Sequence, residues 1–290
     1  MSNRLDSSIL GVPVIAAVGA GLAFAGSDGG YAVGAVPIYA ICVALAFGIQ
    51  WIAFVPAYLL QTEKFYDLVG SLTYLAVIAV AVYLSPARDT RSLLLLALVS
   101  LWAMRLGSFL FRRILADGFD RRFADIKPSF SKFLLAWTLQ GLWVSFSLAA
   151  ALAAVTSATR AGFGVLALLG GAVWLFGFGI EAIADRQKRR FRKDPANAGR
   201  FIATGLWAWS RHPNYFGEIV LWCGIAVIAV PNLAGWQFLT LISPVFVYLL
   251  LTRISGIPLL ERGADERWGG EPDYEHYKRT TPVLFPRPPR

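Results

Sequence analysis

The chain consists mainly of long apolar runs separated by short polar segments. Eight runs can be distinguished, and each approaches the ~20 residues that a helix needs to cross a bilayer. Because backbone polar groups in lipid must be paired within the segment, each run is predicted to be helical. The fold expected is an all-α, polytopic transmembrane helical bundle of about eight spans (seven to eight). The predicted spans are 9–26, 34–60, 68–84, 92–111, 133–155, 163–184, 215–230 and 236–257.

The composition agrees with a membrane protein and narrows the choice of partners. Of the 290 residues, 57% are hydrophobic and 16% are charged, and the mean hydropathy is +0.57. A soluble domain of this length has too little interior to bury so much apolar surface. The net charge is +9, but the basic residues lie between apolar runs, where they can orient the protein in a membrane. We therefore expect membrane lipid as a partner, and no nucleic acid.

The Lys and Arg residues are divided unequally between the two sides of the predicted bundle. With the N-terminus inside, 23 of the 27 fall in inner segments and only three in outer loops. Cytoplasmic loops carry the excess of Lys and Arg, so both termini are predicted to be cytoplasmic. No linker or internal repeat divides the chain, and residues 1–290 are expected to form a single integral membrane domain. The first run also has features of a secretory signal, with Arg4 before it and 23–25 as a cleavage site, but more spans follow it directly.

Metal and disulfide chemistry is not expected. Both cysteines, Cys42 and Cys223, lie inside apolar runs, and the two histidines, His212 and His276, have no ligand spacing. There is no Walker A motif. The glycines of 177–182 imitate a dinucleotide fingerprint only loosely, because they lie in an apolar helix with no strand before it. The sequence therefore predicts no metal site and no nucleotide site of the usual soluble kinds.

Ionisable and amide side chains in or near the predicted spans mark candidate sites, because they are costly to bury in lipid. Glu181 and Asp185 share one helix face at the end of the sixth span, although they could simply pair with the basic residues that follow. Asn214 and Glu218 have the same spacing at the start of the seventh span. Asp67 opens the third span, where the helix dipole alone would favour an acidic residue.

The segment 200–218 is the strongest candidate for a binding site. Arg211, His212, Asn214 and Glu218 fall within it at the mouth of a predicted helix, and a proline suits the first turn. A helix N-terminus presents free N–H groups and a positive dipole to an anion. A multiply phosphorylated ligand would suit the cations just upstream, although these could also rest on anionic lipid headgroups. Those cations are Arg186, Lys188, Arg189, Arg190, Arg192, Lys193 and Arg200.

Several stretches in the second half of the chain match a known family. They are 174–188, 205–207, 210–218 and 255–261, followed by Tyr274 and Tyr277 before Pro286. On these residues the chain resembles the membrane steroid 5α-reductase superfamily, and most closely its bacterial branch of uncharacterised steroid 5α-reductase-like proteins. The resemblance covers about residues 65–286. It implies an integral protein of the bacterial inner (plasma) membrane with an active site that faces the cytoplasm.

The resemblance also implies a function. Reductases of this group use NADPH to reduce a carbon–carbon double bond conjugated to a ketone, here in a hydrophobic small molecule of steroid-like character. Their cofactor lies in a cytoplasm-facing cavity among the C-terminal helices, and a basic stretch suits its phosphates. The positions that the resemblance implies for the cofactor are Glu181, Asp185, Arg189, Arg192, Arg200, Arg211, His212, Asn214, Glu218, Trp222, Arg253 and Tyr277.

The proton-donor half of the implied reaction matches the family less well. The reductases hold the substrate carbonyl with a glutamate–tyrosine pair from early helices, and near the expected tyrosine this chain has Leu101, Trp102 and Arg105. We predict instead that Tyr66 donates to the carbonyl and stabilises the developing enolate, with Asp67 orienting it.

Two alternatives remain open from the sequence. Isoprenylcysteine carboxyl methyltransferases, which bind S-adenosylmethionine, show a similar pattern, and here 211–217, Glu261, Tyr274 and Tyr277 fit it. The long basic stretch favours a phosphate-rich cofactor over the cationic S-adenosylmethionine. The second alternative is a non-catalytic, lipid-binding membrane protein.

Overall fold

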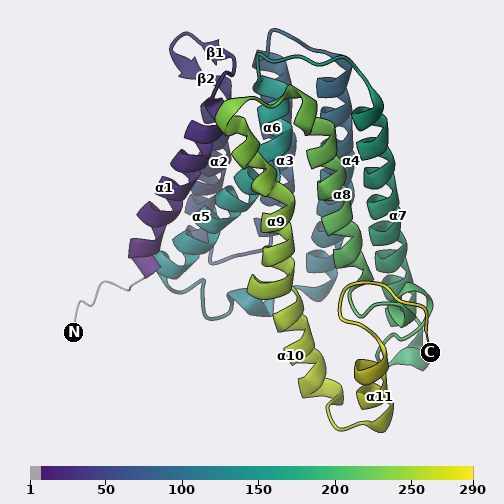
Figure 1. Ribbon diagram of the computed structural model, residues 1–290. Coiled ribbons are helices and arrows are strands. Elements are labelled where there is room, and N and C mark those ends of the chain that lie inside the picture. Colours follow the sequence, from purple (N-terminus) through teal and green to yellow (C-terminus); the bar gives the residue numbers. More distant parts are fainter. Residues whose placement is uncertain (1–7, 290) are drawn as a thin grey trace. The chain divides into compact units, whose positions relative to one another are not determined.

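The computed structural model describes residues 8–289 and is almost entirely helical (Figure 1). Its two short strands, β1 (Ala32–Val33) and β2 (Val36–Pro37), pair antiparallel in a hairpin that joins the first two helices. The helices are α1 (Ser8–Ser27), α2 (Ile38–Leu59), α3 (Tyr66–Leu84), α4 (Thr90–Asp117), α5 (Phe130–Ser147), α6 (Ala149–Thr156), α7 (Val165–Lys193), α8 (Pro213–Ala229), α9 (Ile242–Leu249), α10 (Ile257–Trp268) and α11 (Pro272–Thr280).

The predicted membrane architecture is confirmed. Within residues 8–289, seven helical segments are long and apolar enough to cross a membrane, and the pair α5 and α6, bent by 56°, makes an eighth. The prediction was least accurate at the ends of the spans. The second span begins at Ile38 and not at residue 34, because the hairpin uses the intervening residues and needs Gly34 at a φ of 59°. The sixth continues to Lys193, so the basic stretch predicted to lie in a loop begins as helix.

The chain divides into two compact units, one of residues up to Ala167 with Ile228–Ser243 and one of Leu168–Val227 with the residues from Pro244 onward. In the first unit α2 packs against α3 and α5, and α3 packs against α4. Its interior contains an aromatic cluster that includes Phe54, Phe123, Phe133 and Trp137. Burying these rings removes large apolar areas from water and fixes where the polar ends of the helices meet.

In the second unit, α7 and α8 run side by side at very short range (Figure 1). A Cβ added to Gly177 of α7 would lie 2.5 Å from the carbonyl oxygen of Gly217 on α8. A Cβ added to Gly224 would lie 2.6 Å from the carbonyl oxygen of Gly170. Small residues at such crossings let two backbones approach inside a membrane. The close packing places the buried Glu181 of α7 directly against Gly217.

The last predicted span is broken. It starts as a 3₁₀ helix (Gly235–Leu241), continues as α9, and widens into a π-helical turn (Leu250–Ile254) that ends before α10. At the break, Gly256 has a backbone conformation of φ −89° and ψ −96°, and a side chain there would meet the carbonyl oxygen of Leu251. The break sends α10 and α11 away from the apolar part of the chain, so they can form a polar site beside the end of α7.

Candidate functional site

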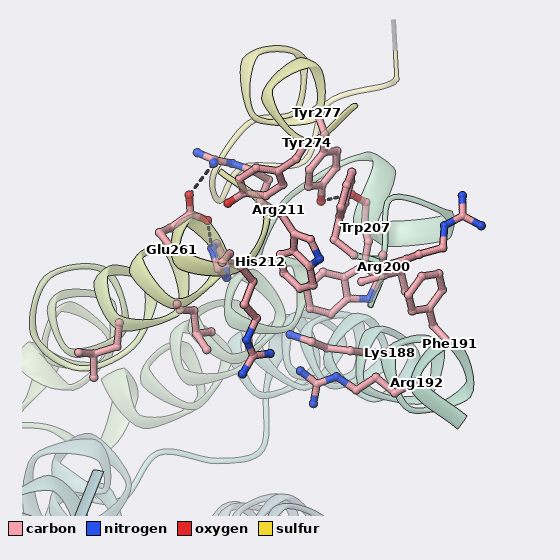
Figure 2. Close-up of a pocket in the computed structure, with 18 residues that line it drawn as sticks. Lys188, Phe191, Arg192, Arg200, Trp207, Arg211, His212, Glu261, Tyr274 and Tyr277 are labelled. Atoms are coloured by element: carbon pink, nitrogen blue, oxygen red, sulfur yellow. Dashed lines mark hydrogen bonds and ion pairs between the residues drawn. The ribbon is translucent and has the colours of Figure 1, made fainter. Parts of the chain in front are cut away.

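A cavity of about 340 Å³ lies in the second unit, between the basic end of α7, the segment before α8, and helices α10 and α11 (Figure 2). It is open to solvent and lined by basic, aromatic and aliphatic residues together with one carboxylate. Its volume is within the range of small-molecule sites. The lining residues are Lys188, Phe191, Arg192, Arg200, Phe201, Ile202, Trp207, Arg211, His212, Leu259, Leu260, Glu261, Gly263, Ala264, Arg267, Trp268, Tyr274 and Tyr277.

One carboxylate joins two neighbouring side chains in this cavity. Glu261 of α10 accepts from Arg211 through Oε2 at 2.5 Å, and its Oε1 lies 2.7 Å from Nε2 of His212 (Figure 2). The backbone fixes both partners, because the Arg211 N–H donates to the carbonyl of Pro282 and the His212 N–H to the hydroxyl of Ser210. Only 12% of the Arg211 side chain is exposed. This partly buried ion pair therefore holds α10 to the segment before α8.

The environment of His212 sets its protonation state. Burial lowers the pKa of His212, and the opposing effect of the Glu261 carboxylate is smaller. We therefore assign a neutral imidazole that donates from Nε2 to Glu261, which leaves Nδ1 as an acceptor. Among the described residues, this buried Nδ1 has no hydrogen-bond partner. A ligand with an N–H or O–H group could satisfy it.

Trp207 connects the end of α7 to α11. Its Nε1 donates to the carbonyl of Ala184 at 3.1 Å, and its own carbonyl accepts from the Tyr277 hydroxyl at 2.7 Å. The Lys188 ammonium lies 4.4 Å from the centre of the indole ring, a cation–π distance. These contacts hold a cation and a flat aromatic surface together on one wall of the cavity.

A second wall is built from aromatic rings. Phe201 lies with its ring centre 5.3 Å from that of Tyr274, 5.4 Å from that of Tyr277 and 5.9 Å from that of Trp268. Trp268 donates from Nε1 to the carbonyl of Gly199 at 2.5 Å, which ties α10 to the same segment. Burial raises the pKa values of the Tyr274 and Tyr277 hydroxyls, so both stay protonated at neutral pH.

Five cations surround these aromatic walls, and the cavity continues beyond them. Two adjoining cavities of about 430 and 600 Å³ share Phe191 and Arg200 with the first. Guanidinium groups bind phosphate with strong, charge-assisted hydrogen bonds, and flat rings stack on ligand rings. The arrangement therefore suits an elongated ligand that carries both phosphates and aromatic rings. The five cations are Lys188, Arg192, Arg200, Arg211 and Arg267.

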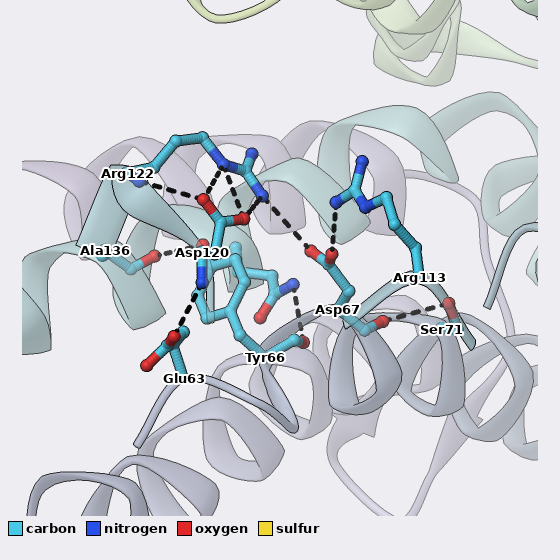
Figure 3. A network of polar contacts seen from close by, with 9 residues as sticks. Glu63, Tyr66, Asp67, Ser71, Arg113, Asp120, Arg122 and Ala136 are labelled. Carbon is cyan, nitrogen blue, oxygen red and sulfur yellow. Dashed lines mark hydrogen bonds and ion pairs between the residues drawn. The ribbon is translucent and has the colours of Figure 1, made fainter. Parts of the chain in front are cut away.

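A polar network in the first unit contains the predicted Tyr66 and Asp67 (Figure 3). The Tyr66 hydroxyl donates to the carbonyl of Ala136 at 2.9 Å, and the ring packs 4.8 Å from that of Phe123. The Asp67 carboxylate lies 3.4 Å from Arg113 and 3.9 Å from Arg122. Tyr66 is thus held by a main-chain carbonyl, whereas the sequence suggested that Asp67 would orient it.

The rest of this network connects the start of α3 with the loop between α4 and α5. Glu63 accepts from the ammonium of Lys127 and from the backbone N–H of Asp120, and Asp120 pairs with Arg122 at 2.6 Å. Burial acts to raise the pKa values of Glu63 and Asp120, but these hydrogen bonds outweigh it and lower both. The carboxylates therefore stay ionised and stabilise the end of the first unit.

The comparisons with known proteins decide the family. A family model described as "Protein of unknown function (DUF1295)" matches residues 53–281. The chain belongs to the DUF1295 family. The resemblance to steroid 5α-reductases is also confirmed, because several relatives carry the name 3-oxo-5-alpha-steroid 4-dehydrogenase 1. No solved structure matches the chain.

The relatives of this DUF1295 protein share only segments with it. It is 38% identical over 71 residues to "3-oxo-5-alpha-steroid 4-dehydrogenase 1" of Bos taurus, which is 24% of this chain and 27% of the relative. It is 31% identical over 120 residues to the protein of that name from Rattus norvegicus, 41% of this chain and 40% of the relative. An uncharacterised protein of Schizosaccharomyces pombe matches at 29% over 136 residues, with 40% of this chain and 37% of the relative covered. The matches thus span less than half the length of these relatives.

The structure brings five of the predicted cofactor residues together in the DUF1295 cavity. They come from the end of α7, the segment between α7 and α8, and α11, so residues far apart in the sequence meet at one site. This convergence agrees with the cofactor site that the resemblance implies, and their cofactor role stays a prediction. The five are Arg192, Arg200, Arg211, His212 and Tyr277.

The other predicted cofactor residues lie outside the lining of this cavity. Glu181, Asp185 and Trp222 are buried, and Glu181 lies against Gly217 of α8. Arg189 is exposed on α7, and Asn214 and Glu218 are half-buried on α8. Arg253 lines a different cavity, formed with the C-terminal tail. The helix spacing that grouped these residues in the sequence is confirmed, but Glu181 faces the contact between α7 and α8.

Several lining residues were not predicted as cofactor residues. Lys188 belongs to the basic stretch and lies one helical turn before Arg192, a spacing that places both on the same face. Trp207 lies in a matching stretch, and its role follows only from its contacts with α7 and α11. Arg267 and Trp268 carried no signal in the sequence, because the break at Gly256 is what brings α10 to the site.

Proposed function

We propose that this DUF1295 protein is an NADPH-dependent oxidoreductase that reduces a carbon–carbon double bond conjugated to a ketone in a lipid-soluble, steroid-like substrate. The observation that carries the proposal is the cavity, in which five cations surround aromatic walls in a chain related to proteins named 3-oxo-5-alpha-steroid 4-dehydrogenase 1. The named relatives, which match over limited lengths, support the class of reaction, and the cations of the cavity support NADPH as the cofactor.

The cations suit the phosphates of NADPH. Arg192 and Arg200 are exposed at the cavity and can turn towards a phosphate, whereas Arg211 is fixed by Glu261 and can act as a rigid donor. A charge-assisted hydrogen bond is typically worth about 1.5–3 kcal/mol. Three such contacts would account for a strong preference for a ligand with several phosphate groups.

The remaining polar and aromatic groups suit the two ring systems of the cofactor. Phe201 and Trp268 offer flat surfaces on which a base can stack. The buried Nδ1 of His212 is an acceptor, and both an adenine amino group and a nicotinamide carboxamide can donate to it. The cavity therefore offers partners for the rings of NADPH as well as for its phosphates.

The reaction needs a hydride and a donor at the ketone oxygen. When bound, NADPH supplies the hydride, which goes to the β-carbon of the double bond, and a proton then goes to the α-carbon. A donor at the ketone oxygen stabilises the enolate that develops between these events. For Tyr66 to be this donor, its hydroxyl must exchange the carbonyl of Ala136 for the substrate oxygen.

We propose that the cavity opens to the cytoplasm of a bacterial cell, with the apolar helices in the inner (plasma) membrane and both termini on the cytoplasmic side. The proposal rests on the excess of Lys and Arg in the predicted inner segments. Reporters fused after Ala124 and Pro195 should be cytoplasmic, and those fused after Gly30 and Thr159 external. Opposite labelling of the Ala124 and Pro195 fusions would reject this topology.

One observation favours a second candidate, an S-adenosylmethionine-dependent methyltransferase. Arg211, His212, Glu261, Tyr274 and Tyr277, which fit the methyltransferase pattern in the sequence, all line the same cavity. The cations argue against it, since S-adenosylmethionine is itself cationic and has no phosphate to pair with them. Transfer of a methyl group from S-adenosylmethionine to a lipid acceptor, without oxidation of NADPH, would establish this candidate instead.

The proposed reaction can be tested on the purified, membrane-reconstituted protein. Lipid-soluble enones, including 3-oxo-4-ene steroids, are supplied with NADPH that carries deuterium on the reactive carbon of the nicotinamide. We expect a product that has gained two hydrogens across the double bond, with deuterium on the β-carbon by mass spectrometry. Arg200→Gln should lower this activity at limiting NADPH, whereas Arg190→Gln, which changes an exposed arginine near the end of α7 outside the cavity lining, should not. Deuterium-free product, or equal effects of the two variants, would contradict the proposal.

A further inference from the structure

A separate cavity of about 290 Å³ lies in the second unit where the C-terminal tail passes the break in the last span. It shares no lining residue with the cavity of Figure 2. The π-helical turn contributes Thr252 and Arg253, α9 contributes Tyr248, and the tail contributes Phe285 and Arg287. It thus combines two arginines with an apolar surface at the point where the chain leaves its apolar run.

The tail is held firmly enough to form one wall of a site. The hydroxyl of Ser210 donates to the carbonyl of Leu284 at 2.8 Å, and the backbone N–H of Arg287 donates to the carbonyl of Trp209 at 2.9 Å. The side chain of Leu284 in the tail is itself buried. Backbone bonds therefore fix the position of Arg287, although its side chain is exposed.

Contacts among residues 8–289 do not account for the two arginines of this cavity, Arg253 and Arg287. Both are exposed, and within residues 8–289 neither guanidinium forms an ion pair or a hydrogen bond with another group. Arg253 lies in a π-helical turn, in which the Ser255 N–H donates to the carbonyl of Leu250, and such turns are often found at functional sites. Two unpaired cations at one cavity attract an anion, and the planar guanidinium suits phosphate.

The surroundings of these cations are apolar. Ile254 and Phe285 are each 62% exposed, and Leu249 and Val283 are also exposed beside the cavity. In a chain that spans a membrane, cations at the end of an apolar run lie at the depth of the lipid headgroups. A free phosphate would use only the charges here, whereas a phospholipid would use the charges and the apolar surface together.

We propose that this cavity binds the headgroup of an anionic phospholipid, with its phosphate between Arg253 and Arg287 and its acyl chains along Ile254 and Phe285. Arg253 is thereby a lipid-binding residue, whereas its resemblance to the reductases implied a cofactor contact. The site does not depend on the proposed enzymatic function. The tail that lines this site also supplies the Pro282 carbonyl, which accepts from the backbone N–H of Arg211. Bound lipid would therefore stabilise the tail.

The test uses the full chain purified in detergent and reconstituted into nanodiscs of phosphatidylcholine with one-tenth phosphatidylglycerol. Native mass spectrometry then measures how much phosphatidylglycerol the released protein retains. We expect the wild type to retain it in preference to phosphatidylcholine, and the double variant Arg253→Gln, Arg287→Gln to retain at least tenfold less. A matched double variant, Lys193→Gln with Arg262→Gln, removes two exposed cations outside the cavity lining and should retain it normally.

The other possible results of this experiment distinguish a phospholipid site from its alternatives. Equal retention in the two double variants, or no preference for phosphatidylglycerol in the wild type, would overturn it. Displacement of the lipid by millimolar inorganic phosphate would show a phosphate site and not a lipid site. If Arg253→Gln raises the NADPH dissociation constant and leaves lipid retention unchanged, Arg253 belongs to the cofactor. If the double variant does not fold, Arg253→Lys and Arg287→Lys keep the charges and should retain the lipid.

Discussion

His212 Nε2 lies 2.7 Å from Glu261 Oε1, and this contact joins the segment before α8 to helix α10. Glu261→Gln should weaken it and leave the largely buried Arg211 without its anion. Because Arg211 then loses its fixed position, we expect the NADPH dissociation constant to rise about tenfold, or about 1.4 kcal/mol. Nucleotide titration of the purified variant measures this. Glu266→Gln, an exposed change on the same helix, is the control and should bind normally. Equal affinity in both variants would remove Glu261 from the site.

The lowered pKa of His212 predicts a pH dependence of stability. In the unfolded chain the imidazole titrates at about 6.5. In the folded protein burial, with the nearby cations Lys188 and Arg211, moves the pKa below that value against the opposing effect of Glu261. Between the two pKa values the unfolded state binds more protons, so the free energy of unfolding decreases as the pH falls below about 6.5. Unfolding in detergent at pH 5 to 7.5 measures the slope. His212→Gln should reduce it, while His276→Gln, which changes the exposed histidine, should not. A reduced slope in the His276 variant alone would contradict the assignment.

Tyr66→Phe distinguishes a structural from a catalytic tyrosine. The change removes the hydroxyl that donates to Ala136 and keeps the ring in its aromatic cluster. We expect the free energy of unfolding to fall by about 0.5–1.5 kcal/mol, with NADPH affinity and the hydride-transfer rate nearly unchanged. Single-turnover oxidation of NADPH measures the rate. A fall of about 10²–10⁴-fold would restore the catalytic role predicted from the sequence.

The close approach of α7 and α8 predicts a strong effect of a single methyl group. Gly177→Ala places a Cβ 2.5 Å from the carbonyl oxygen of Gly217, a backbone atom that cannot move aside. Such overpacking typically costs about 1–3 kcal/mol. Gly179→Ala is the matched control, because nothing lies within 4 Å of its Cβ, and it should be neutral or slightly stabilising. The difference in unfolding free energy between the two variants tests the packing, and equal values would contradict it.

The membrane architecture could be predicted from the sequence because apolar length alone determines which segments can span a bilayer. What the sequence could not show was where those segments bend. The Ser147–Ala149 junction and the Gly256 break lie inside continuous apolar or mixed runs. The second of these breaks determines which residues reach the site.

The candidate site was predictable only in part, for the same reason. The sequence indicated four of the lining residues because they lie close together along the chain and either are basic or match the reductase family. These are Arg192, Arg200, Arg211 and His212. Arg267 reaches the cavity only through the redirected α10, which no local pattern indicated. Helix spacing correctly grouped Glu181 with Asp185, but it could not show that both are buried, with Glu181 against Gly217 of α8.

Nucleotide binding by the purified wild-type protein is the most direct test of the proposed function. Isothermal titration with NADPH and, separately, with S-adenosylmethionine compares the phosphate-rich cofactor with the cationic one at the same cavity. We expect saturable binding of NADPH that Arg200→Gln weakens, and a dissociation constant for S-adenosylmethionine at least tenfold higher. Tighter binding of S-adenosylmethionine than of NADPH would contradict it.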